Sequence, residues 1–195
     1  MAFSAADFLA ELSEERRKQM ETFAEAMLRW NKKINVTAAK NIADVLDHCV
    51  DGIVASRLIP RDAKMLVDVG SGGGLPLVPM AIMRPDVAMV GVEPIAKKWA
   101  FILSCSRDLG LANLEAKQSR VEELGAIGTF DVATSKATFE MARWLDVGLS
   151  LVKPNGAVLG FGSAAAIPTI SSENDIIRFS RGGSNYWISR TWRSN

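Results

Sequence analysis

The chain has 195 residues, of which 48% are hydrophobic and 23% are charged, and its formal net charge is +1. This length fits one α/β domain with an extension and excludes two full domains. A net charge so near zero does not favour a nucleic-acid-binding protein, so any basic patch must be local. No apolar run approaches the length of a membrane span. Cys49 and Cys105 lack metal-like spacing, which predicts reduced, buried thiols in a cytoplasmic protein.

Helical patterns occupy most of the first sixty residues. Ser13 followed by two glutamates is a helix-start signal, and apolar residues then recur at helical spacing to about Trp30. A second apolar face runs from Ile42 to Leu58. Sixty residues are too few for a firm core of their own. We therefore expect residues 1–60 to form a helical cap on a following sheet, and residues 61–195 to form the main domain.

The next segment has the order strand, tight turn, helix. Met65–Val69 is an apolar run too short for a helix, and it ends at a cluster of glycines before a helical pattern begins. Gly70, Gly72 and Gly74 permit positive φ and lack the Cβ atoms that would hold a ligand away from the backbone. The turn is therefore predicted to bind a ligand. A turn that only joins strand to helix is the alternative.

An acidic residue follows the next predicted strand, residues 87–92. Glu93 should return beside the glycine turn, where open α/β sheets hold a ribose diol. The dinucleotide fingerprint would place glycine or alanine where Leu75 stands, and Asp68 would repel a pyrophosphate but can face a sulfonium or ammonium cation. The pattern resembles the first motif of the class I S-adenosylmethionine methyltransferases, which makes S-adenosylmethionine the expected cofactor.

The remaining elements complete an α/β prediction. Lys136 directly follows a predicted fourth strand, whose carboxyl end should face the cleft. We expect a Rossmann-like class I methyltransferase fold, with a mostly parallel sheet, helices on both faces and an N-terminal helical extension. Strands are predicted at residues 114–116, 130–135 and 157–161 and, as an edge strand, at 184–192, with a turn at 154–156, a helix at 137–152 and an irregular segment at 162–175. Four arginines near the C-terminus, among aromatic residues, suit RNA or guard a short edge strand.

Several motifs form a specific combination in this chain. They are Trp30-Asn31 with Asn35-Val36-Thr37, His48 with Asp51, Leu75-Pro76 and Arg84-Pro85. In combination they resemble the bacterial small-subunit ribosomal RNA guanine-N7 methyltransferases, also called glucose-inhibited division protein B, over most of the chain from about Trp30 to the turn at 153–156. The resemblance implies methyl transfer from S-adenosylmethionine to guanine N7 of small-subunit (16S) ribosomal RNA, as naked RNA or in the 30S particle. It implies no metal, and we expect a monomer.

The resemblance also assigns residues. Guanine N7 has an exposed lone pair and no proton to remove, so no catalytic acid or base is expected. The cofactor would be bound by Gly70, Gly72, Gly74, Leu75, Glu93, Val121, Glu122 and Lys136, and the substrate by Asn35, His48, Asp51 and Lys136. Simpler roles remain open for three of these: Asn35 in a capping turn, His48 in packing and Glu122 at a helix start.

Two departures from the family pattern leave alternatives. Lys136 stands where the family usually has arginine, so a two-pronged contact is lost while the charge is kept. Phe161-Gly162 stands where the family often has lysine and glycine. The chain could instead methylate a small molecule on the same fold, or bind cofactor or ribosome as a degenerate relative without transfer.

Overall fold

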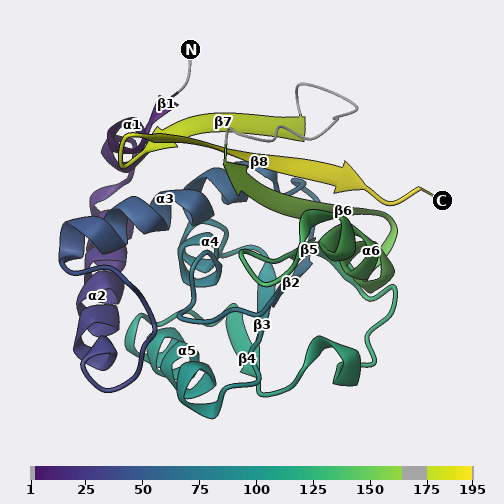
Figure 1. The fold of residues 1–195 in the computed structure, drawn as a ribbon, viewed down its shortest axis with the longest axis horizontal. Helices are drawn as coiled ribbons and strands as arrows, with labels where there is room; N and C mark the ends of the chain where they lie inside the picture. The colour runs from purple at the N-terminus through teal and green to yellow at the C-terminus, as the bar shows by residue number, and fades with distance from the viewer. Residues whose placement is uncertain (1–2, 164–174, 195) are drawn as a thin grey trace.

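One sheet organises the molecule (Figure 1). The computed structural model describes residues 3–163 and 175–194. Its eight strands lie in the order β1-β7-β8-β6-β5-β2-β3-β4, and the neighbours from β6 to β4 are all parallel. The strands are β1 (Phe3–Ser4), β2 (Met65–Val69), β3 (Ala88–Val92), β4 (Leu114–Lys117), β5 (Phe130–Thr134), β6 (Val152–Ser163), β7 (Ile176–Arg181) and β8 (Ser184–Trp192).

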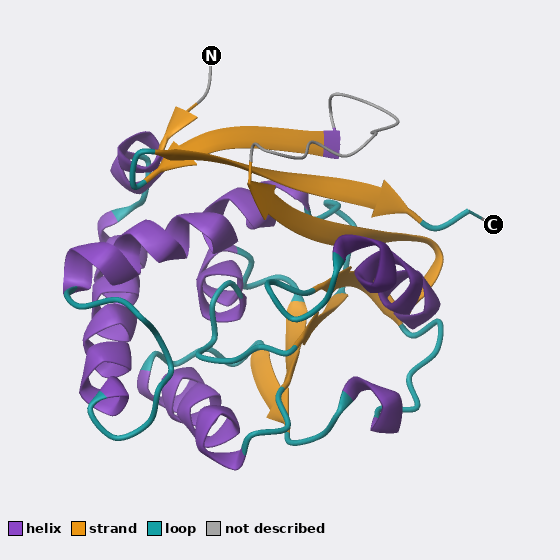
Figure 2. Cartoon of the chain, viewed as in Figure 1, coloured by secondary structure: helices purple, strands orange, loops and turns teal. Residues whose placement is uncertain are grey.

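Helices pack on both faces of this sheet, as predicted (Figures 1 and 2). Ser13 and Asn41 cap α2 and α3, because each side chain accepts a hydrogen bond from a main-chain amide three residues on. In Figure 1, α2 to α5 lie on one side of the parallel strands and α6 on the other. The helices are α1 (Ala5–Ala10), α2 (Glu14–Asn31), α3 (Ile42–Leu58), α4 (Leu77–Met83), α5 (Ala96–Asp108), α6 (Met141–Leu151) and the 3₁₀ turn Val121–Glu123.

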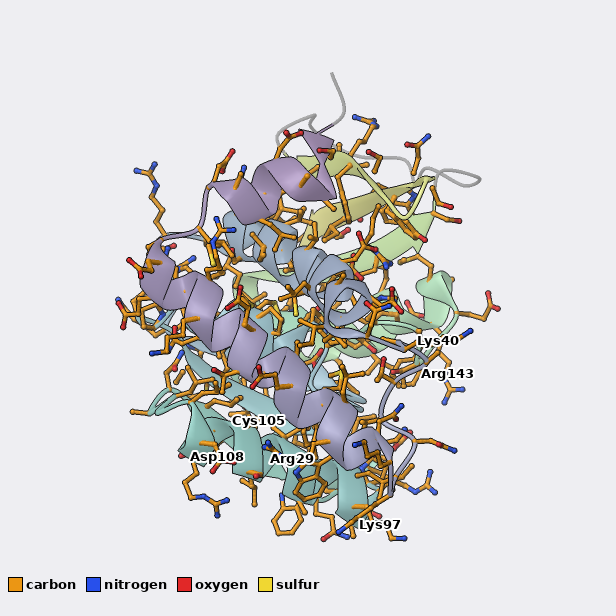
Figure 3. The ribbon with its side chains drawn as sticks, turned by 90° about the vertical axis from the view of Figure 1, so that its left-hand side faces the viewer. Arg29, Lys40, Lys97, Cys105, Asp108 and Arg143 are labelled. Carbon is orange, nitrogen blue, oxygen red and sulfur yellow. The ribbon has the colours of Figure 1, made fainter. Side chains whose placement is uncertain are left out.

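The alternation of β2 divides the core into two layers. Leu66 belongs to the hydrophobic cluster under α2 to α5, whereas Val67 belongs to the smaller cluster under α6. Cys49 and Cys105 are buried, as predicted. Burial raises the pKa of the Cys105 thiol to about 12, and Arg29 on α2 opposes this rise (Figure 3). No helix among the described residues is both long and apolar enough to cross a membrane.

The C-terminal prediction needs correction. β8 is not an edge strand: it lies between β6 and β7 and runs antiparallel to both. Sequence patterns missed β7 because Arg181 occupies one of its buried positions. Of the segment predicted as irregular, Gly162 and Ser163 extend β6, and residues 164–174 lie outside the described residues.

Three other boundaries differ from the sequence patterns. The turn predicted at 154–156 is a bulge within β6, where Asn155 adopts a positive φ of 62° and the register with β5 shifts. α6 begins only at Met141, because Ala137 also has positive φ and interrupts the predicted helix. β1 and α1 precede the first predicted helix, and β1 adds a parallel edge to β7.

Candidate functional site

The glycine turn is attached to the end of the neighbouring strand. The amides of Gly70 and Ser71 donate to the Val92 carbonyl at 2.8 and 3.2 Å. Gly70, Gly72 and Gly74 have φ values of 72°, 54° and 75°, so the positive φ expected from the sequence is confirmed. The turn thus lies at the carboxyl ends of β2 and β3, where open α/β sheets bind ligands.

Glu93 returns beside the turn, as predicted. The residue is 4% exposed, and its carboxylate accepts hydrogen bonds from the Gly72 amide on Oε2 and from the Ile95 amide on Oε1, each at 2.8 Å. The acid therefore fixes the shape of the turn. An ionised carboxylate has about four lone-pair sites, so two bonds to amides leave acceptor capacity for hydroxyl groups.

The surroundings of the glycines show where a ligand could lie. A Cβ on Gly70 would clash with Thr138, and one on Gly73 would lie 2.6 Å from the Val36 carbonyl in the α2–α3 loop. A Cβ on Gly72 would meet only the Gly70 carbonyl, at 3.8 Å. The turn is therefore closed by protein at two positions and open at Gly72, where the backbone forms a cradle that any larger residue would fill.

Next to the turn is a cavity of about 200 Å³, which we call the turn cavity. Gly70, Val121 and Glu122, which the resemblance assigns to the cofactor, line it. Phe139 and Arg143 also line it and were missed, because the sequence pattern placed both within one continuous helix. The guanidinium carbon of Arg143 lies 5.4 Å from the Phe139 ring centroid. Apolar walls with a carboxylate and backbone amides suit a flat heteroaromatic ring.

Gly74 and Leu75, both predicted to bind the cofactor, contact other parts of the protein. The Gly74 amide donates to the Ser71 carbonyl at 2.7 Å, and a Cβ there would lie 2.8 Å from Val78. Leu75 is half-buried against the larger hydrophobic cluster. These two residues shape the turn, and the turn cavity is lined by others.

Asp68 lies under the turn as a buried acid. Its side chain is fully buried, and neither carboxylate oxygen has a hydrogen-bond partner among the described residues. The nearby Ser71 hydroxyl donates instead to the Asp68 main-chain carbonyl, at 2.8 Å. Burial raises the pKa of Asp68 to about 7, and Lys136 opposes this rise. An unpaired buried carboxylate beneath the cradle fits a cationic ligand.

This acid predicts a pH dependence of stability. The pKa of Asp68 is raised by folding, so the folded state holds its proton between about pH 3.8 and 7 and stability falls as pH rises through that window. We expect the unfolding free energy of the ligand-free protein to fall by about 3 kcal/mol between pH 5 and pH 8 through this group. Urea denaturation of the wild type and of Asp68→Asn measures the difference. Equal slopes with pH in both proteins would exclude Asp68 as the source.

Three residues predicted to contact the substrate are brought together around α3. The Lys136 ammonium pairs with Asp51 Oδ2, and Asp51 is 3% exposed. Arg181 Nη1 lies 2.8 Å from His48 Nδ1, and because a guanidinium only donates, Nδ1 is the acceptor. Burial lowers the pKa of His48, and the charges of Arg181 and Lys136 lower it further. The ring is therefore neutral at pH 7.

Asn35 is not part of this cluster. It is exposed in the α2–α3 loop, where the Asn31 side chain accepts the amides of Val36 and Thr37 at 2.9 and 3.2 Å. The side chain that stabilises the turn in this loop is therefore that of Asn31, whereas the sequence left this role open for Asn35. Asn35 faces outward on a loop that covers the glycine turn through Val36.

A second cavity, of about 210 Å³, adjoins the cluster, and we call it the substrate-side cavity because Asp51 and Lys136, both predicted to contact the substrate, line it. Asp51, Lys136 and Arg181 line it together with Phe161, which stands where the resemblance led us to expect lysine. Ala137 lines this cavity, whereas Thr138 lines the turn cavity. One short loop after β5 therefore contributes to both cavities, and Lys136 lines the substrate-side cavity but not the turn cavity.

The strand order and the glycine turn at the carboxyl ends of β2 and β3 are those of the class I methyltransferase fold. Solved structures agree on the fold: M. jannaschii TYW2 in complex with AdoMet aligns with a TM-score of 0.58 at 11% identity, covering 83% of this chain and 80% of that one. A SAM dependent methyltransferase from Aquifex aeolicus aligns with a TM-score of 0.56 at 14% identity, covering 76% and 92%.

Sequence relatives identify the family. The family model described as GidB, rRNA small subunit methyltransferase G, matches residues 16–179, and the chain belongs to this family. The Ribosomal RNA small subunit methyltransferase G of Polynucleobacter asymbioticus is 37% identical over 163 residues, covering 80% of this chain and 73% of the relative. That of Halorhodospira halophila is 34% identical, covering 78% and 72%. The resemblance inferred from the motifs is thereby confirmed, with S-adenosylmethionine as cofactor and small-subunit ribosomal RNA as substrate.

Proposed function

We propose that this chain transfers the methyl group of S-adenosylmethionine to N7 of a guanine in small-subunit ribosomal RNA, acting as a cytoplasmic monomer. The observation that carries the proposal is the glycine turn, open at Gly72 and held by Glu93, one loop away from the cation of Lys136. A cofactor site in the turn cavity and a charged substrate site in the substrate-side cavity would then lie on either side of the same loop.

The turn side would hold the cofactor. The open backbone at Gly72 would receive the methionine portion, and the remaining lone pairs of Glu93 would accept the ribose hydroxyls. Val121 and Glu122 would border the adenine in the turn cavity. The bound cofactor supplies a methyl group on a positively charged sulfur. The protein then has to orient the two reactants, which is its main contribution to such a displacement.

The substrate side would orient the base. Guanine presents O6 and N7 side by side as acceptors in the major groove, and lysine is a frequent partner of this edge. The Lys136 ammonium, fixed by Asp51, could donate to O6 and leave the N7 lone pair directed at the methyl group. Because N7 carries no proton, neutral His48 is not needed as a base.

Exposed cations along one edge of the molecule suit an RNA backbone. Lys40, Lys97 and Arg143 are exposed and fall along the same edge of the molecule in Figure 3. None of the three forms an ion pair within the part of the chain that the structure describes. Unpaired cations of this kind contact phosphates without reading sequence. Residues 1–60 would serve as a cap that carries Lys40 and the exposed Asn35 toward the RNA.

Base mapping in a strain lacking this protein tests the proposal. Mass spectrometry of small-subunit RNA should show one guanine that loses its 7-methyl group in the deletion strain and regains it on complementation. Purified protein with labelled cofactor should then methylate 30S particles or naked RNA, which distinguishes the two substrates. Label entering only a metabolite pool would point to a small-molecule enzyme, and cofactor binding without transfer to a non-catalytic relative.

A further inference from the structure

A buried arginine joins the C-terminal hairpin to α3. Arg181 ends β7 and is 9% exposed, and among the described residues its three polar side-chain partners all lie on α3. Nη1 contacts His48 Nδ1 at 2.8 Å and lies 3.6 Å from Asp47 Oδ2. Nε lies 3.2 Å from Asp51 Oδ1, in an ion pair too bent for a hydrogen bond. The guanidinium thus binds three side chains of one helix from the opposite end of the chain.

Aromatic packing fixes the orientation of this guanidinium. Its central carbon lies 4.4 Å from the ring centroid of Tyr186, the first aromatic residue of β8. Tyr186 in turn stacks on Phe179, with ring centroids 5.9 Å apart. A planar cation held by an aromatic face and by three polar side chains has little rotational freedom. Arg181 therefore contacts other side chains of the protein. It is one of the four arginines near the C-terminus, for which the sequence suggested contact with RNA as one of two roles.

Asp51 carries the effect of Arg181 to the substrate-side cavity. One carboxylate oxygen pairs with Lys136 and the other with Arg181, and the side chain is almost fully buried. Removing one partner of a buried ion pair leaves the charge of the other partner uncompensated, and that side chain is then free to reorient. We propose that Arg181 is a positioning residue: through Asp51 it fixes the Lys136 ammonium in the substrate-side cavity and so sets the rate of methyl transfer without binding the cofactor.

The same hairpin offers a matched control. Arg190 of β8 pairs with buried Asp175 at 2.8 Å and donates to the Leu58 carbonyl at 3.1 Å. Like Arg181, it is a mostly buried arginine that ties the hairpin to the rest of the fold. It does not line the substrate-side cavity and has no contact with Asp51 or Lys136 among the described residues.

Kinetics on three variants distinguish a positioning role of Arg181 from a general role in stability. This test rests on the proposed function, because it measures methylation of small-subunit RNA. Arg181→Met should lower kcat for methylation of small-subunit RNA by about tenfold to a hundredfold, because a small misplacement of an orienting group costs rate. The cofactor Kd should change by less than about twofold. Arg181→Lys, which keeps a cation beside Asp51, should recover most of kcat. Arg190→Met should leave kcat unchanged, so an equal loss in that control would overturn the inference.

A double variant tests the link through Asp51. If Arg181 acts through that carboxylate, Asp51→Asn and Arg181→Met should each lower kcat, and the double variant should be no slower than the slower single variant. The double variant also removes both buried charges, so it remains interpretable if Arg181→Met alone unfolds. Losses that multiply would show that Arg181 acts by another route.

A spectroscopic readout is independent of catalysis. The ¹⁵N-labelled ammonium of Lys136, held by a buried carboxylate, should give a slowly exchanging NMR signal in the wild type and in Arg181→Lys, but not in Arg181→Met. A signal that survives in Arg181→Met, or is absent from the wild type, would overturn the positioning role. If the wild type methylates no small-subunit RNA, the proposed function fails, and this signal still decides whether Arg181 fixes Lys136.

Discussion

Gly72→Asp is expected to raise the cofactor Kd by at least about a hundredfold, roughly 3 kcal/mol, while the protein remains folded. The new side chain would enter the open side of the turn, where the nearest neighbouring atom is the Gly70 carbonyl oxygen at 3.8 Å. It would occupy the space assigned to the methionine portion and add a carboxylate beside Glu93, whose Oε2 lies 2.8 Å from the residue's own amide. Isothermal titration calorimetry with S-adenosylmethionine measures the change.

Two controls isolate the cause of this loss. Gly72→Asn has the same size without the charge and tolerates positive φ, so it should show an intermediate loss if both size and charge contribute. Gly110→Asp places aspartate at another glycine of positive φ, 65°, with no neighbour within 4 Å of its Cβ. It should reproduce the cost of backbone strain and leave the cofactor Kd unchanged. Unchanged affinity in Gly72→Asp would remove the turn from the cofactor site.

Local sequence patterns were sufficient for the glycine turn and Glu93, although not for Phe139 and Arg143 of the turn cavity. The period of apolar residues and the caps at Ser13 and Asn41 determine α2 and α3 within their own segments. The glycines demand positive φ, and the strand after them is short enough to bring Glu93 back beside them. These features depend on residues close together in the chain, so sequence periodicity and turn chemistry could predict them.

The substrate side depends on contacts between distant segments. Arg181 and Asp51 are far apart in sequence and meet only because β8 inserts between β6 and β7, which aims the end of β7 at α3. An arginine in a tail rich in basic and aromatic residues resembles an RNA contact until its partners are known. Arg190 likewise pairs inward with Asp175. Strand order and buried ion pairs are set by tertiary packing, which local patterns do not encode.

Lys136→Met is expected to lower the rate of methyl transfer by about a hundredfold and to change the cofactor Kd by less than about threefold. The side chain pairs with Asp51 in the substrate-side cavity and does not line the turn cavity, so its removal should affect the base more than the cofactor. Single-turnover incorporation of label into small-subunit RNA measures the rate, and calorimetry measures the affinity. A large loss of cofactor affinity would place Lys136 at the cofactor.

Lys136→Arg is the matched variant, because the resemblance led us to expect arginine at this position. A guanidinium can contact Asp51 and still present a donor to the base, so we expect the rate to stay within about fivefold of the wild type. Retained activity in Lys136→Arg with loss in Lys136→Met would show that the positive charge is what the reaction uses. Equal losses in both would show that the length and point charge of lysine matter, and that this chain has adapted its cavity to the lysine.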